Sequence, residues 1–171
     1  RIDIRSYSAA NTENGRLNTT TTYTSTSDWY HIYYEFDSAN ATAGDRMRLW
    51  VNGTEVTSFA TDTNPTAESY TGTQNVGLGA LATGGNPFDG KIYQFAFFSG
   101  TLPGISAVYD SVNSRPKDVV GLAGLWSYLD TNGSDAITLD YQRTIANATA
   151  TNWTNTNTVV HSTDVPYIYT V

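Results

Sequence analysis

The 171-residue sequence contains no cysteine, which excludes disulfide bonds, thiol catalysis and any zinc site with thiolate ligands. Charged residues are also scarce, at 15% of the chain against about 25% in an average soluble domain. The 9 Lys and Arg residues are outnumbered by 16 Asp and Glu residues, which leaves a net charge of -7. With so few cations, we expect neither nucleic acid nor an anionic membrane as a partner.

Long hydrophobic runs are also missing, because no stretch reaches the roughly 18 apolar residues that a membrane-spanning helix requires. No basic segment followed by an apolar one indicates a signal peptide. Met47 is the only methionine, and the sequence opens with Arg1. We therefore expect the chain to be a fragment or a processed product.

Aromatic residues are abundant by contrast, at 13% of the chain, and together with many threonines they give a strand-forming composition. Residues 1–8 alternate apolar and charged side chains, which predicts a strand with one buried face. Residues 9–27 are rich in Asn, Thr and Ser and predict either a loop or an edge hairpin around Asn14-Gly15. Residues 28–36 carry aromatic and apolar side chains at both odd and even positions, and so on both faces of a strand. This pattern predicts a central strand.

A hairpin is predicted at Asn52-Gly53, because this dipeptide lies between two alternating runs and favours the positive φ angles of a type I′ turn. Further short strands are predicted near 75–81, 90–98 and 121–129. Apolar side chains at spacings of three and four predict one short helix near 103–112, which Pro116 would end. Many short strands with one helix predict an all-β protein built as an antiparallel β-sandwich or jelly roll.

Three segments, in this order, resemble strands of the laminin-G-like, concanavalin A-like jelly-roll family. Segment 29–37 begins with Trp and ends with an aromatic residue and Asp, segment 48–56 contains the Asn-Gly hairpin, and segment 88–98 reads Phe-x-Gly-x-Ile. The resemblance implies such a jelly roll over residues 1–118, either lacking its N-terminal strands or completed by partner chains. Tyr93 occupies a position that is usually acidic in the family.

Residues 119–171 are predicted to form a C-terminal β extension or a docking tail. The segment from Gly121 to Pro166 resembles an extension that follows such jelly rolls in proteins of marine phages and bacteria. Phage virions use these domains as capsid decorations and as tail or fibre modules. The resemblance therefore implies a structural or adhesive role on a virion surface, with capsid proteins, tail proteins or copies of the chain itself as partners.

Concanavalin A-like folds also include glycoside hydrolases, whose Glu-x-Asp-x-x-Glu signature places two carboxylates beside the scissile bond. Glu35 and Asp37 begin this signature, but Asn40 stands where the general acid should be. We therefore expect no enzymatic activity and interpret the two carboxylates as solvent-facing charges. Residues 77–82 imitate a dinucleotide-binding fingerprint, but the Gly- and Pro-containing segment 83–87 forbids the helix that this motif requires.

A calcium site is the one cofactor that the sequence offers. Asp130, Asn132 and Ser134 alternate oxygen ligands, with Asp135 adjacent, as at the start of a calcium-binding loop. The pattern then fails at its sixth and twelfth positions, so we favour a hairpin turn at Asn132-Gly133 and expect no obligatory cofactor.

Carbohydrate binding is the alternative function. Trp50 beside Arg48 offers an aromatic platform for a sugar ring, and Asn86 and Asp89 offer polar acceptors for its hydroxyls. Asn86 and Asp89 are also a second candidate site for calcium. The competing interpretation is that a neighbouring strand or another subunit covers Trp50. The leading hypothesis is thus a virion surface module, the second a secreted lectin-like module that binds cell-surface glycans, and the third a hydrolase.

Overall fold

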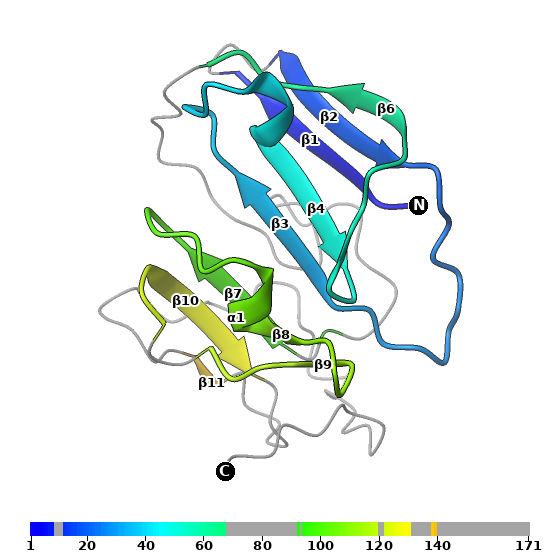
Figure 1. Cartoon of the computed structure of the whole chain (residues 1–171), viewed down its shortest axis with the longest axis vertical. Helices are drawn as coiled ribbons and strands as arrows, with labels where there is room; N and C mark the ends of the chain where they lie inside the picture. The colour runs from blue at the N-terminus through cyan, green and yellow to red at the C-terminus, as the bar shows by residue number, and fades with distance from the viewer. Residues whose placement is uncertain (9–11, 68–91, 93, 120–121, 131–137, 140–171) are drawn as a thin grey trace, which may run out of the picture. The chain divides into compact units, whose positions relative to one another are not determined.

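The computed structural model describes residues 1–8, 12–67, 92, 94–119, 122–130 and 138–139. The described elements are mostly strands, and all the strand pairs are antiparallel (Figure 1). The chain forms two compact units, one of residues 1–73 with 109–116 and the other of residues 74–108 with 117–171. The predicted domain boundary near residue 118 stays a prediction. The all-β prediction is confirmed.

The first sheet of the first unit contains β1 (Asp3–Tyr7), β2 (Glu13–Thr19) and β6 (Phe59–Thr63), in the order β1-β2-β6. The strand predicted within residues 1–8 is confirmed. For residues 9–27 the prediction was either a loop or an edge hairpin around Asn14-Gly15. Neither alternative holds for residues 13–19, because they form β2, the middle strand.

Packing explains why a glycine stands inside β2. A Cβ atom at Gly15 would lie 2.8 Å from the sulfur of Met47 and 2.9 Å from the Cδ of Pro65. Such contacts are too close for carbon, so only glycine fits without displacing a neighbour. Gly15 therefore does not form a turn; it allows the side chains of Met47 and Pro65 to approach the backbone of β2 closely.

The second sheet of this unit contains β3 (Ile32–Phe36), β4 (Met47–Val51) and β5 (Thr54–Glu55), in the order β3-β4-β5. A short 3₁₀ helix, η1 (Ala43–Asp45), lies in the connection from β3 to β4. Asn52 and Gly53 have φ angles of 50° and 78°, as a type I′ turn requires. The predicted Asn-Gly hairpin is confirmed.

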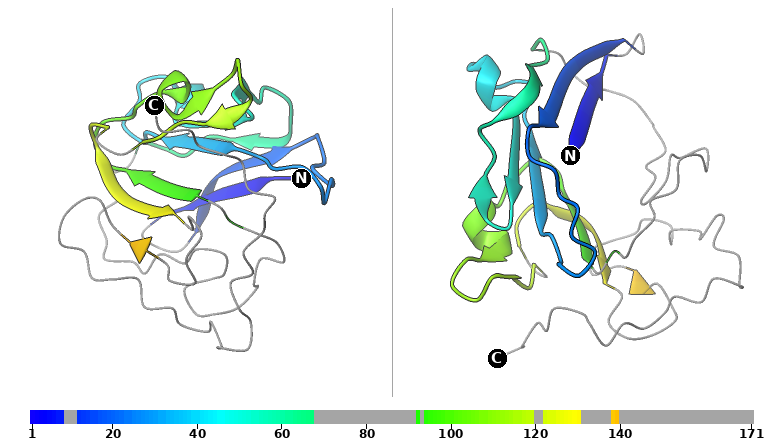
Figure 2. Two further views of the ribbon diagram at one scale, coloured as in Figure 1. Left: turned by 90° about the horizontal axis from the view of Figure 1, so that it is seen from below. Right: turned by 90° about the vertical axis from the view of Figure 1, so that its right-hand side faces the viewer.

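Apolar side chains from both sheets meet in one core. Its fully buried members are Leu17 on β2 and Met47 and Leu49 on β4. The partly buried residues around them are Ile2, Ile4, Tyr34, Phe36, Val56 and Phe59. Because strand side chains alternate between the two faces of a sheet, each sheet directs one face towards this core and the opposite face away from it. Figure 2 shows the strands of both sheets in two further views. The first unit is therefore a two-layered β-sandwich.

The helix predicted over 103–112 is shorter in the structure. Helix α1 (Ile105–Val108) ends where β8 (Tyr109–Asp110) begins, and β8 pairs with β9 (Arg115–Pro116). The Asp110 carboxylate accepts hydrogen bonds from the backbone N–H groups of Val112 and Asn113, at 3.0 and 3.2 Å. These bonds stabilise a turn at the expense of the helix, and they leave Val112 89% exposed.

The second unit contains α1 and a sheet of β7 (Gln94–Phe98), β10 (Leu125–Asp130) and β11 (Thr138–Leu139), in the order β11-β10-β7. The strands predicted within 90–98 and 121–129 correspond to β7 and β10. The strand predicted near 75–81 lies outside the described residues, as does most of the C-terminal extension. In the described part of the chain, no helix is long and apolar enough to span a membrane.

Candidate functional site

The outer face of the β3-β4-β5 sheet carries a polar and aromatic group of side chains, which we call the Arg48 cluster. Its members are Tyr33 and Glu35 on β3, Arg48 and Trp50 on β4, and Glu55 on β5. Strand register brings them together, because Tyr33 pairs with Trp50, Glu35 with Arg48, and Trp50 also with Glu55. Residues directly opposite one another point to the same side of a sheet, so all five share the face opposite the core.

Charged groups within the Arg48 cluster neutralise one another. The Arg48 guanidinium donates two hydrogen bonds to Glu55, from Nε at 2.9 Å and from Nη2 at 3.0 Å. Its Nη1 lies 3.9 Å from Glu35, whose other oxygen accepts a 2.8 Å hydrogen bond from the Tyr33 hydroxyl. The bonds with Glu55 raise the pKa of Arg48 above its ordinary value. The arginine is therefore held in place by carboxylates of two neighbouring strands.

Trp50 lies inside this cluster and is 6% exposed. The Arg48 guanidinium carbon lies 4.6 Å from the centre of its ring, and the Tyr33 ring centre is 5.3 Å away. The structure thus brings Arg48 and Trp50 together, as the sequence predicts, but it covers the indole. A sugar would stack on Trp50 only after its neighbours moved aside, and the carbohydrate-binding role of this pair stays a prediction.

The positions that match the hydrolase signature are each engaged locally. Glu35 accepts a hydrogen bond from the Tyr33 hydroxyl and forms an ion pair with Arg48. The Asp37 carboxylate accepts a 3.1 Å hydrogen bond from the backbone of Ala39. The Asn40 side chain accepts a 2.9 Å bond from the backbone of Thr42. These residues shape the chain between β3 and η1, where short polar side chains commonly stabilise turns.

The other predicted site residues mostly lie outside the part of the chain that the structure describes. These are Asn86 and Asp89 of the carbohydrate proposal and Asn132, Ser134 and Asp135 of the calcium proposal. Asp130 ends β10, where its backbone is paired with Gln94 and Thr138. Among the described residues, no group of three or more metal-binding side chains occurs. Calcium binding therefore stays a prediction.

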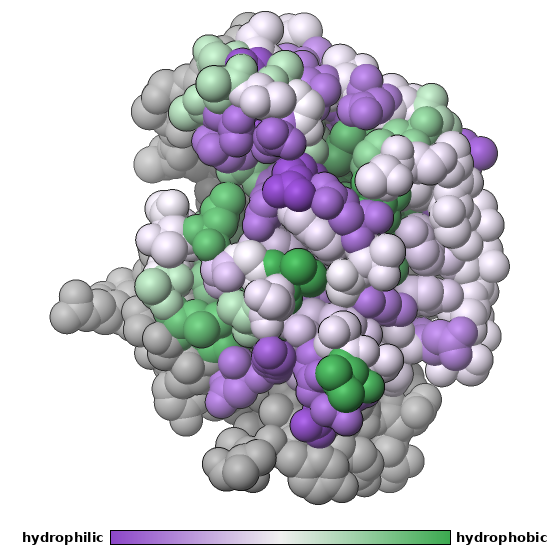
Figure 3. All heavy atoms as spheres, in the orientation of Figure 1, coloured by the Kyte–Doolittle hydropathy of each residue, from purple (hydrophilic) through white to green (hydrophobic). Residues whose placement is uncertain are grey.

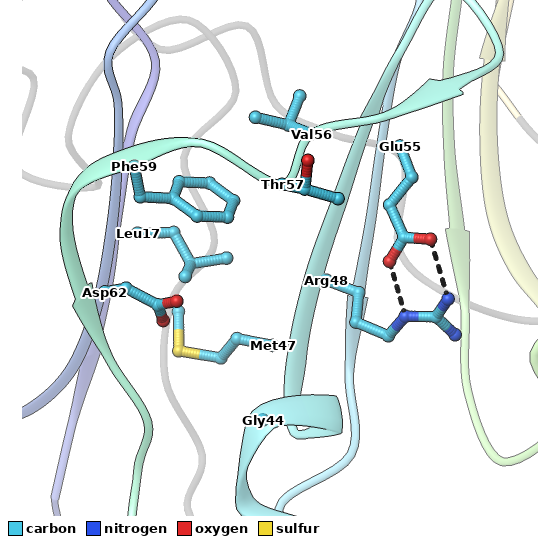
Figure 4. A pocket seen from close by; sticks show the side chains of 9 residues that line it. All are labelled: Leu17, Gly44, Met47, Arg48, Glu55, Val56, Thr57, Phe59 and Asp62. Carbon is cyan, nitrogen blue, oxygen red and sulfur yellow. Dashed lines mark hydrogen bonds and ion pairs between the residues drawn. The ribbon is translucent and has the colours of Figure 1, made fainter.

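A cavity of about 170 Å³ lies in the first unit and was not predicted from the sequence (Figure 4). Leu17, Met47, Val56 and Phe59 supply apolar lining, and Asp62, Thr57, Gly44, Arg48 and Glu55 complete it. Figure 4 shows the apolar side chains and Asp62 gathered on one side of β4, with the Arg48–Glu55 pair on the other side.

A β-bulge explains why the sequence did not reveal this cavity. Phe59 pairs with Thr19, but Thr61 pairs with Asn18, so Ala60 is an extra residue in β6. Period-two alternation would place Asp62 on the face opposite Phe59. The extra residue reverses that parity, so Asp62 pairs with the buried Leu17 and shares its face.

The Asn52-Gly53 turn is fixed by contacts with His31 and Tyr109. The Asn52 side chain accepts a 2.8 Å hydrogen bond from the His31 backbone N–H, and the Asn52 N–H donates a 2.8 Å bond to the His31 carbonyl. The rings of His31 and Tyr109 lie 4.8 Å apart. Burial lowers the pKa of His31, so its ring is neutral at physiological pH. Tyr109 is 6% exposed and packs directly over Gly53.

Exposed apolar side chains do not form a continuous face in the described residues. Tyr7 and Ile32 of the first unit are 43% and 52% exposed, and Phe97 and Leu102 of the second are 43% and 42% exposed. On the side of the molecule shown in Figure 3, apolar residues are interrupted by polar ones. Scattered apolar residues are ordinary on protein surfaces and by themselves indicate no docking site.

Asp3 lies between two arginines on the outer face of the first sheet. Arg16 donates hydrogen bonds to it at 2.9 and 2.8 Å, and Arg5 donates two, at 2.9 and 3.3 Å. The hydrogen bonds from Arg16 and then from Arg5 hold the pKa of the Asp3 carboxyl well below its usual range. Because these groups are partly exposed, solvent limits the stability that they supply.

We expect Asp3→Asn to lower the free energy of unfolding at pH 7 by at most about 1 kcal/mol. A carboxyl whose pKa is lowered by folding stabilises the folded state above its unfolded pKa, about 3.9, and loses this effect as the pH falls. The difference between the two proteins should therefore shrink below about pH 4. Urea denaturation at pH 7, 4 and 2.5 measures it, with Asp28→Asn at an exposed position as the control. A difference that grows towards low pH would contradict the assignment.

By its fold, the protein is an all-β module of antiparallel sheets, with a two-layered sandwich in its first unit. The chain belongs to the concanavalin A-like lectin/glucanases superfamily, specifically the family described as Laminin_G_3, whose profile matches residues 2–104. This match covers more than half of the 171 residues. No curated protein and no solved structure matches the chain significantly.

Proposed function

We propose that this chain is a non-enzymatic structural or adhesive module of a virion surface, as a capsid decoration or as a tail or fibre appendage. The observation that carries the non-enzymatic part is the local engagement of Glu35, Asp37 and Asn40. Glu35 is held by Tyr33 and Arg48, and the other two side chains stabilise turns. A retaining glycosidase needs a free nucleophile and a carboxylic acid about 5.5 Å from it, and Asn40 cannot supply a proton.

The virion context is supported by the resemblance of residues 121–166 to extensions in phage proteins. The partners of the module are capsid or tail proteins, or copies of the chain itself. The low charge and the abundance of Thr, Asn and Tyr favour docking through hydrogen bonds and aromatic contacts over electrostatic binding of polyanions.

An activity assay tests the non-enzymatic part of the proposal. We expect no release of reducing sugar from a panel of β-glucans, either by the full chain or by its Glu35→Gln variant. Turnover by the original chain that Glu35→Gln removes would overturn the proposal. The Asp28→Asn variant is the matched control, because it removes one exposed carboxylate outside the signature.

Carbohydrate binding by a secreted module is the second candidate, favoured by the lectin members of the superfamily and by the stacked Arg48–Trp50 pair. A glycan array with and without calcium tests it. Binding that is weakened at least tenfold by Trp50→Leu would support a sugar site at the Arg48 cluster, since stacked aromatic rings supply much of the affinity at such sites. An array that is blank in both conditions would remove this candidate.

A further inference from the structure

The cavity of the first unit combines apolar side chains with two carboxylates, Glu55, which is paired with Arg48, and Asp62, which is exposed. Leu17 and Met47 are 1% and 2% exposed, and Val56 and Phe59 are half-buried around them. Asp62 lines the same cavity from β6, on the face of the sheet that Leu17 also uses. Within the part of the chain that the structure describes, the Asp62 carboxylate has no ion pair and no side-chain hydrogen bond.

The arginine that lines this cavity does not neutralise Asp62. Arg48 is bonded through two of its nitrogens to Glu55, and these two opposite charges cancel. Figure 4 shows this pair turned away from the apolar side chains. The uncompensated charge among the lining residues is therefore negative. A cation at the mouth is attracted and an anion is repelled, in line with the net charge of -7.

We propose that this cavity binds a lysine side chain of the protein on which the module docks, an inference that rests on the proposed function. A lysine carries a four-carbon apolar stem and a terminal ammonium. The stem can cover the half-buried Val56 and Phe59 while the ammonium reaches Asp62. A cavity of about 170 Å³ is large enough for such a chain. The site thus gives the docking surface one anchoring contact of defined chemistry.

Capped tripeptides test the chemistry of the ligand directly. The full chain is titrated with acetyl-Gly-Lys-Gly-amide, while backbone amide shifts are followed by two-dimensional NMR. The same peptide with norleucine retains the apolar stem without the ammonium, and the peptide with glutamate reverses the charge. We expect shifts centred on Leu17, Met47 and Asp62, with lysine bound roughly fivefold more tightly than norleucine and no saturation by glutamate. Equal affinity for all three peptides would overturn the proposal.

Alkylammonium ions separate a cavity from a surface ion pair. Each buried methylene is expected to tighten binding by up to about fourfold, so n-butylammonium should bind at least tenfold more tightly than methylammonium. If the two ions bind equally, the charge alone attracts them and no side chain enters the cavity. That result would also overturn the proposal.

Substitutions assign the effect to Asp62. Asp62→Asn should reduce the lysine peptide to the affinity of the norleucine peptide, while the exposed Asp28→Asn should leave both affinities unchanged. An unchanged lysine affinity in Asp62→Asn would overturn the site. These titrations are done with the isolated chain and need no particle. If the chain associates with particles but does not bind the lysine peptide, the lysine site alone is rejected. Binding of the probes without particle association would instead reject the proposed function.

Discussion

Leu49→Ala is expected to destabilise the protein by about 3 kcal/mol, which is the typical cost of removing a buried leucine side chain. Leu49 is 0% exposed on the middle strand of its sheet and contributes to the core between the two sheets, with Leu17 and Met47. The cost combines the lost burial of apolar atoms with the cavity that the neighbours cannot fill. Equilibrium denaturation in urea, followed by tryptophan fluorescence, measures the change.

Ile32→Ala is the matched control for this experiment. Ile32 lies on the neighbouring strand β3 and is 52% exposed, so its truncation should cost less than about 1 kcal/mol. If the two variants are equally stable, the core does not lie between these sheets, and the sandwich arrangement of the first unit is contradicted.

Gly53→Ala is expected to lower the free energy of unfolding by about 3 kcal/mol, for two separate reasons. Gly53 has a φ of 78°, a backbone conformation that costs an alanine roughly 1–2 kcal/mol. A Cβ atom there would also lie 2.5 Å from the Cδ1 of the buried Tyr109, which adds a steric cost of about 1–3 kcal/mol. Thermal unfolding by circular dichroism should show a lower midpoint for this variant.

Gly44→Ala is the control, and it should act in the opposite direction. A Cβ atom at Gly44 meets no atom within 4 Å, and the residue lies in the short helix η1. Alanine is tolerated there and restricts the unfolded chain, so we expect a gain of about 0.4–1 kcal/mol. In a Tyr109→Ala background, Gly53→Ala should cost less, because the steric part disappears. Equal costs in both backgrounds would contradict the contact between Gly53 and Tyr109.

Local signals allowed much of the first unit to be predicted from sequence. The alternation around Ile4 and Leu49 predicted strands with one buried face, and the dipeptide Asn52-Gly53 predicted a type I′ turn. These features depend on residues close in sequence and on backbone preferences that a short segment already expresses.

Features that depend on distant residues were predicted wrongly or missed. One of the two alternatives for residues 9–27 made Gly15 a turn residue, but it provides space for Met47 and Pro65, which are far away in sequence. The helix near 103–112 was predicted too long, because its periodicity did not include the competing bonds of Asp110. The cavity was missed because an extra residue in β6 reverses the face of Asp62. A strand pairing must be known before any of these effects can be recognised.

The candidate site was predicted in part. Alternation within β4 places Arg48 and Trp50 on one face, as the sequence predicted. The sequence did not reveal that Glu55 and Glu35 hold the arginine. Cross-strand partners follow from the pairing of β3 and β5 with β4, which a single sequence does not specify. That bonding places Trp50, the predicted sugar platform, inside a polar network of neighbouring side chains.

Electron microscopy of particles from the native source tests the central claim most directly, namely that this chain is a docking module of a virion surface. The account predicts repeated density on the particle into which the two-layered sandwich of the first unit fits. It also predicts that an antibody against the chain labels those positions. Particles without such density, together with a chain found only free in solution, would contradict the account.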